Sequence, residues 1–91
     1  MKNVVLVVLD TARADVLHQH VETTSDSALS RLASEGTTFD AAFAGSPWTL
    51  PSHASLFTAT YPSRHGAHAD HKALSTGPIT LAEAFAAASY E

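Results

Sequence analysis

The chain has 91 residues and a mass of 9.6 kDa, which excludes more than one domain because domains commonly run to about 100–150 residues. Hydrophobic residues make up 45% of the sequence, a share that argues against intrinsic disorder. Five lysines and arginines against nine acidic residues give a formal net charge of −4, so nucleic acid and anionic membranes are poor candidate partners. The chain has no cysteine, which excludes disulfides, thiolate metal cages and cysteine nucleophiles.

The first predicted element is a strand at residues 4–9, with the sequence VVLVVL. An uninterrupted β-branched run without polar alternation is typical of a strand covered on both faces in a parallel sheet. The run is too short for a secretory signal, which needs about 7–15 apolar residues, or for a membrane span of about 20. We therefore expect an α/β fold and a cytoplasmic location.

A helix follows from residue 26. Leu29 and Leu32 recur at helical spacing, Asp26 can accept hydrogen bonds from the amides of the first turn, and Gly36 can end the helix in the left-handed conformation. Residues 37–43 then have modest strand character and are predicted as a weaker strand.

Two later segments also predict helices. Proline is favoured in the first turn of a helix, so Pro51 predicts a short helix that begins just after Thr49 and runs through Thr58. Thr80 and Glu83 have the spacing of a capping box and open an alanine-rich helix predicted through about Ser89.

One strong strand and one weak strand make a poor sheet for a chain whose first strand needs two covered faces. We therefore expect a partial α/β sheet with flanking helices, in a chain that is incomplete and stops where a further strand would follow.

Two residues stand where chemistry is expected. Asp10 directly follows the first strand, and ligands of open α/β sheets gather beyond the carboxyl ends of the strands. Thr49 precedes a helix whose positive end can hold a sulfate or phosphate group. Each also has a purely structural interpretation as a helix N-cap, Asp10 for a helix beginning at Thr11 and Thr49 for the helix after it.

Three segments resemble the amino-terminal part of the sulfatase family within the alkaline phosphatase superfamily: residues 3–10, 46–58 and 61–66. The family signature is Cys or Ser, any residue, Pro, Ser, Arg, four residues, Thr and Gly. Its positions fall in order on Thr49, Pro51, Ser52, His53, Thr58 and Ala59. The resemblance implies that residues 1–91 are the amino-terminal part of a sulfatase-like catalytic domain. It places the nucleophile at Thr49 and a metal-binding aspartate at Asp10.

The departures from the signature bear on the chemistry. The family oxidises cysteine or serine to formylglycine, but Thr49 carries a methyl group on its β-carbon, so its oxidation would give a ketone and no formylglycine is expected. His53 replaces the signature arginine, whose role at this position is therefore doubtful. Direct attack by the Thr49 hydroxyl remains open, as in threonine-nucleophile phosphodiesterases of the same superfamily, with a divalent metal bound by Asp10 and Thr49.

The metal and the function stay open at this point. The resemblance implies a divalent metal, calcium or else zinc, manganese or magnesium, and Thr11 departs from the second aspartate that often follows the first. The histidines at 18, 20, 65, 68 and 71 could form a zinc cluster or could be solvated loop residues. Three functions fit: a sulfate ester hydrolase inactive on its own, a metal-dependent phosphoester or phosphodiester hydrolase, or a non-catalytic remnant or binding module that folds with the missing remainder of the domain.

Overall fold

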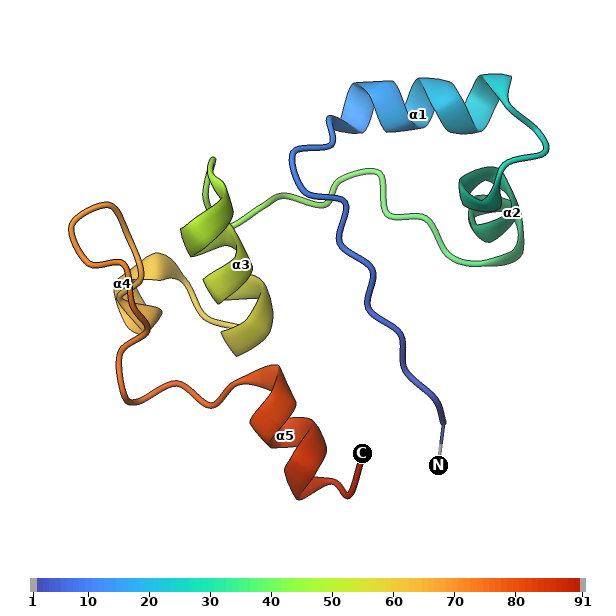
Figure 1. Ribbon diagram of the computed structural model, residues 1–91. Helices are drawn as coiled ribbons and strands as arrows, with labels where there is room; N and C mark the ends of the chain where they lie inside the picture. The colour runs from blue at the N-terminus through green and yellow to red at the C-terminus, as the bar shows by residue number, and fades with distance from the viewer. Residues whose placement is uncertain (1, 91) are drawn as a thin grey trace. The chain divides into compact units, whose positions relative to one another are not determined.

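The computed structural model describes residues 2–90, and the chain divides into two units, residues 1–42 and 43–91. Figure 1 shows helices joined by irregular chain, without a sheet in the described part. The first unit contains α1 (Ala14–Thr23) and α2 (Ala28–Glu35). The second contains α3 (Thr49–Thr58), α4 (Pro62–His65) and α5 (Leu81–Ala87). The predicted α/β class is therefore not what residues 2–90 form, because they are mostly helical.

Both predicted strands are absent from the described residues. Residues 4–9 run as extended coil, and their side chains lie open, with Val5 84% and Val7 74% exposed. Residues 37–43 are interrupted by a turn at Asp40 and Ala41. A strand exists only when a neighbour takes up its N–H and C=O groups, and within residues 2–90 the second run is too broken to serve as that neighbour.

A turn separates residues 4–9 from α1. Thr11 adopts the left-handed conformation with φ 59°, and Arg13 is the N-cap residue of α1. The Arg13 guanidinium forms a two-pronged ion pair with Asp15, with Nη2 to Oδ2 at 2.6 Å and Nε to Oδ1 at 3.0 Å. Asp10 is therefore not the cap of a helix beginning at Thr11, because α1 begins three residues later.

Ser30 ties α2 to the end of α1. Its hydroxyl is buried and donates to the carbonyl oxygens of Val21 and Thr24. Ser27, not the predicted Asp26, caps α2, since its Oγ accepts the Ser30 N–H at 3.1 Å.

Gly36 ends α2 in an extended conformation, φ −111°, rather than in the predicted left-handed one. A side chain would still not fit there, because a Cβ atom on Gly36 would lie 2.8 Å from the carbonyl oxygen of Leu32.

The second unit is built around α3, which packs against α4 and α5. The helix begins at Thr49 itself, one residue earlier than the predicted start, with Trp48 as its N-cap residue. Pro51 lies in the first turn as predicted and is fully buried. Thr58 is the last residue of the helix, and its Oγ1 donates to the Ala54 carbonyl at 2.6 Å.

Beyond α3 the chain turns twice. Ala59 takes the left-handed conformation with φ 52°, at the position where the signature glycine was expected. Gly66 closes α4 with φ 75°. The capping box of Thr80 and Glu83 is confirmed, although α5 ends at Ala87 rather than near Ser89.

Little apolar surface is enclosed. Among the described residues, the buried hydrophobic side chains are Ala54 and Ala67, next to the fully buried Pro51 and His65. Within residues 2–90 no helix has the length and hydropathy needed to cross a bilayer.

Candidate functional site at the start of α3

Thr49 is the first residue of α3, so its side chain stands at the positive end of the helix dipole. Trp48 precedes it in an extended conformation, φ −141°, and offers no side-chain hydrogen bond to the first turn. Pro51 lowers the conformational cost of starting a helix here, because its ring already fixes a helical φ. The local sequence therefore places Thr49, an exposed residue, where a negatively charged group is favoured.

His53 lies one turn along α3 from Thr49. Its Nδ1 is 3.0 Å from the carbonyl oxygen of Thr49, and because a carbonyl only accepts, Nδ1 carries the proton and Nε2 is the acceptor nitrogen. The ring also lies against Phe57, with centroids 6.2 Å apart. At the position of the signature arginine, the structure thus has a half-buried imidazole turned back onto its own helix.

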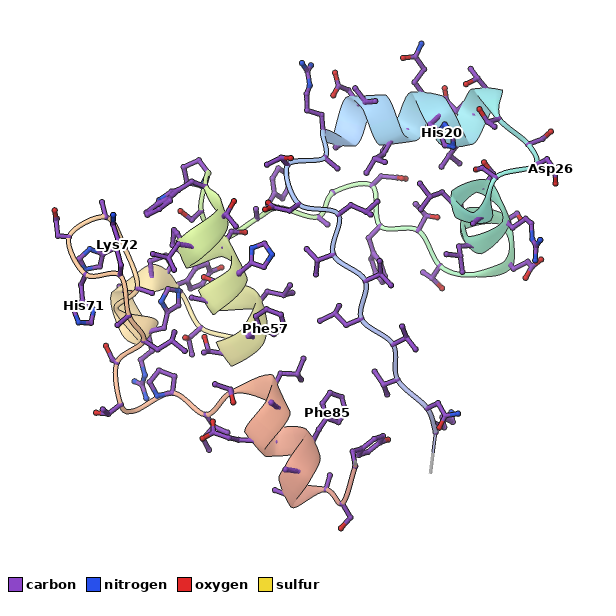
Figure 2. The ribbon with its side chains drawn as sticks, viewed as in Figure 1. His20, Asp26, Phe57, His71, Lys72 and Phe85 are labelled. Atoms are coloured by element: carbon purple, nitrogen blue, oxygen red, sulfur yellow. The ribbon has the colours of Figure 1, made fainter. Side chains whose placement is uncertain are left out.

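A groove of about 580 Å³ opens beside Thr49. Its walls are mostly apolar and come from α3 and from the loop after α4, and they comprise Trp48, Thr49, Leu50, His53, Ala54, Phe57, Ala67, Lys72, Ala73 and Leu74. Lys72 is the only lysine or arginine among these lining residues. Figure 2 shows Lys72 on the loop next to α4 and Phe57 on α3. The groove therefore has a mostly apolar lining to which one lysine and the first residue of α3 also contribute.

The comparison with family models decides the family. A model described as Sulfatase matches residues 2–91. The chain belongs to the sulfatase family. No curated protein and no solved structure gives a match to it. The resemblance found in the motifs is thereby confirmed, and the family points to an alkaline-phosphatase-like origin for a chain whose described part is helical.

In this sulfatase-family chain, Asp10 lies in the turn before α1, and its residue is exposed. It belongs to the first unit, whereas Thr49 belongs to the second. The joint binding of a metal by Asp10 and Thr49 stays a prediction.

The sulfatase family typically holds a metal ion, and the donor set of this chain does not fit one by itself. Within residues 2–90 no group of three or more His, Cys, Asp or Glu side chains is placed to hold a metal. Calcium takes about six to eight oxygen ligands, and a catalytic zinc about three protein ligands.

The two histidines of the loop after α4, His68 and His71, form hydrogen bonds with backbone groups of the same loop. Nδ1 of His68 accepts the Asp70 N–H at 3.3 Å, and Nδ1 of His71 donates to the Gly66 carbonyl at 3.2 Å. A single antiparallel bridge also joins His68 to His71, so these two residues close a tight turn.

Two features of the second unit were not predicted from the sequence. Lys72 becomes part of the groove only because the loop after α4 folds back along α3. His65 and Ser55 form a hydrogen bond of 3.0 Å across ten positions of sequence. The Gly66 that follows His65 was the one local hint, since glycine permits the close turn that buries the imidazole.

Proposed function

We propose that this sulfatase-family chain carries the nucleophile of an enzyme that hydrolyses sulfate or phosphate esters, and that the nucleophile is the Thr49 hydroxyl. The observation that supports the proposal is the place of Thr49, at the first residue of α3 and on the rim of the groove that contains Lys72. A sulfate or phosphate group at this point would face the positive end of the α3 dipole, in a groove whose lining residues include a lysine.

The chemistry that fits these residues is a two-step displacement. Thr49 Oγ would attack the sulfur or phosphorus atom while the bond to the ester oxygen breaks, and the proton of the threonine hydroxyl would pass to that oxygen, which departs as the alcohol. Water would then cleave the threonyl ester and restore the hydroxyl. The positive end of α3 stabilises the added charge on the transferred group, and the apolar wall of the groove suits a hydrophobic leaving group.

Threonine favours phosphate esters and diesters as a second candidate substrate class. Formylglycine cannot form from Thr49, and formylglycine is the nucleophile that the family resemblance associates with sulfate esters. A hydroxyl that attacks directly needs no such modification, so the two ester classes are to be compared in one assay.

The test uses the whole chain with an aryl sulfate and a bis-aryl phosphate, followed by intact mass and by peptide mass at Thr49. We expect release of at least one aryl group per chain and an adduct on Thr49, because the first step transfers the sulfuryl or phosphoryl group to its hydroxyl. Thr49→Ala should abolish release and adduct, whereas Thr49→Ser should keep both.

Thr23→Ala is the matched control, since Thr23 is exposed at the end of α1 and its hydroxyl bonds only the Gln19 carbonyl there. Release equal to wild type in Thr49→Ala, or no adduct with either ester, would contradict the proposal. The second outcome would favour a binding module or a non-catalytic remnant.

A further inference from the structure

His65 is the only fully enclosed imidazole among the described residues, with 0% of its surface exposed. The N–H of Ala67 points at its Nδ1 at 3.0 Å, and because an amide N–H can only donate, Nδ1 is the unprotonated nitrogen. The proton of the neutral ring therefore sits on Nε2, which donates to Ser55 Oγ at 3.0 Å. Since Nε2 already carries a proton, it cannot take one from Ser55, and the pair is not a nucleophile and its base.

His65 accepts hydrogen bonds from both ends of the loop after α4, residues 66–75. Its ring accepts the Ala67 N–H, and its carbonyl oxygen accepts the Ser75 N–H at 2.8 Å. Ala67 also lines the groove beside Thr49, and three further lining residues lie between the two anchors: Lys72, Ala73 and Leu74. The near end of this groove wall is thus held by a hydrogen bond that only an unprotonated Nδ1 can accept, and its far end by the backbone carbonyl of the same residue.

We propose that His65 is a pH-sensitive latch, and that its protonation at Nδ1 releases the loop of residues 66–75 and opens the groove wall. A proton on Nδ1 would face the Ala67 N–H, so two donors would point at each other around a residue that is closed to solvent. The loop must move away before the charged ring can find an acceptor. This inference goes beyond the proposed function, because release of the loop requires no ester.

The surroundings of His65 offer little compensation for a positive charge. The titratable and charged groups on the segments packed against it are Arg64 on α4, His53 on α3, and His68, Asp70, His71 and Lys72 in the loop. Asp70 is the one acid of this set, and it is exposed. Both nitrogens of the His65 ring are occupied by Ser55 and Ala67 rather than by a carboxylate.

The direction of the pH effect follows from these contacts. The latched loop contains the neutral ring, and the released loop lets the ring reach water and accept a proton. A histidine in unfolded chain takes up its proton near pH 6.5. Neutral pH therefore favours the closed loop, and acid favours its release.

The experiment is nuclear magnetic resonance of the whole chain at about pH 7.5 and about pH 5.5. At the higher pH we expect the nitrogen chemical shifts of the His65 ring to show an unprotonated Nδ1 and a protonated Nε2. Protection of the Ala67 and Ser75 amides against hydrogen exchange, corrected for intrinsic rates, should fall about tenfold at the lower pH. The Arg31 amide, bonded to the Ser27 carbonyl in α2, should keep its protection.

His65→Asn supplies an amide oxygen near Nδ1 that cannot titrate, so it should remove the pH dependence at Ala67, whereas the exposed His18→Asn should keep it. A proton on Nδ1 at the higher pH, an unprotected Ala67 amide there, or an equal fall in His65→Asn would overturn the proposal. If His65→Asn does not fold, the ring tautomer and the exchange of the wild-type chain decide the matter.

Discussion

At the scale of single residues, the hydrogen-bond partner of a histidine decides which of its ring nitrogens carries the proton. His53 and His65 are both imidazoles of the second unit, yet the carbonyl beside His53 and the amide beside His65 select opposite tautomers. Such assignments need the partner atom, which the sequence does not reveal. Thr49 could be predicted at a helix start because Pro51 marks the first turn locally.

Glu83 gives a residue-scale prediction for pH. The N–H of Thr80 and then its hydroxyl bond the Glu83 carboxylate and hold the pKa of Glu83 below its ordinary value of 4.5. A lowered pKa in the folded chain means that this stabilisation is present above pH 4.5 and is lost as the pH falls through the lowered value. We expect α5 to fray on acidification in that range, and Cα chemical shifts of residues 81–87 report it.

Thr80→Ala removes the hydroxyl from this pair, so it should move the titration midpoint of Glu83 back toward 4.5, while Thr80→Ser should leave it near the wild-type value. An unchanged midpoint in Thr80→Ala would show that the backbone N–H alone accounts for the lowered pKa.

At the scale of elements, the sequence patterns that predicted helix starts correctly were those whose contacts lie within one helical turn. The capping box at Thr80 and the proline at position 51 act through atoms three residues away or fewer, so sequence predicts them well. The cap of α2 was mistaken because Asp26 and Ser27 can both cap, and Ser27 is the one whose Oγ reaches the Ser30 amide. The structural interpretation of Asp10 placed the start of a helix at Thr11, three residues too early, because no capping side chain marks the start of α1 at Ala14.

Ala59 gives the prediction that belongs to α3. Alanine in the left-handed conformation is strained by its Cβ, and the sulfatase signature places glycine at this point. We expect Ala59→Gly to raise the free energy of unfolding of the second unit by up to about 1 kcal/mol, as measured by urea denaturation. The gain stays small because glycine also increases the freedom of the unfolded chain.

Ala54→Gly is the matched comparison, since Ala54 lies inside the same helix and is buried. This change should lower the free energy of unfolding by about 1 kcal/mol. A loss of similar size in Ala59→Gly would show that position 59 does not hold the left-handed conformation.

At the scale of the whole molecule, the predicted sheet failed because sheet formation is decided by partners distant in sequence. The run at residues 4–9 has the composition of a buried strand, and composition alone carries no information on whether a second strand is at hand. The hydrogen bond between Ser55 and His65 and the place of Lys72 in the groove beside α3 were not predicted either, because they too depend on residues distant in sequence.

The exposed run leads to a prediction for the chain as a whole. Val5 and Val7 are among its most exposed side chains, so Val5→Lys with Val7→Lys should change the free energy of unfolding by less than about 0.5 kcal/mol. The double variant should also aggregate less, because extended apolar segments pair between chains. Urea denaturation and light scattering measure the two effects.

Ala67→Lys, at a site only 1% exposed, is the destabilising control. A loss in Val5→Lys with Val7→Lys as large as in that control would mean that residues 4–9 are packed in solution and that the predicted strand exists there.

The small size of the buried apolar set has a calorimetric consequence. Ala54 and Ala67 are the buried hydrophobic residues of the described chain, and the heat capacity of unfolding grows with the apolar area newly exposed to water. A chain with so little to expose has a shallow stability curve: its enthalpy of unfolding changes slowly with temperature, and its melting is broad rather than a sharp peak.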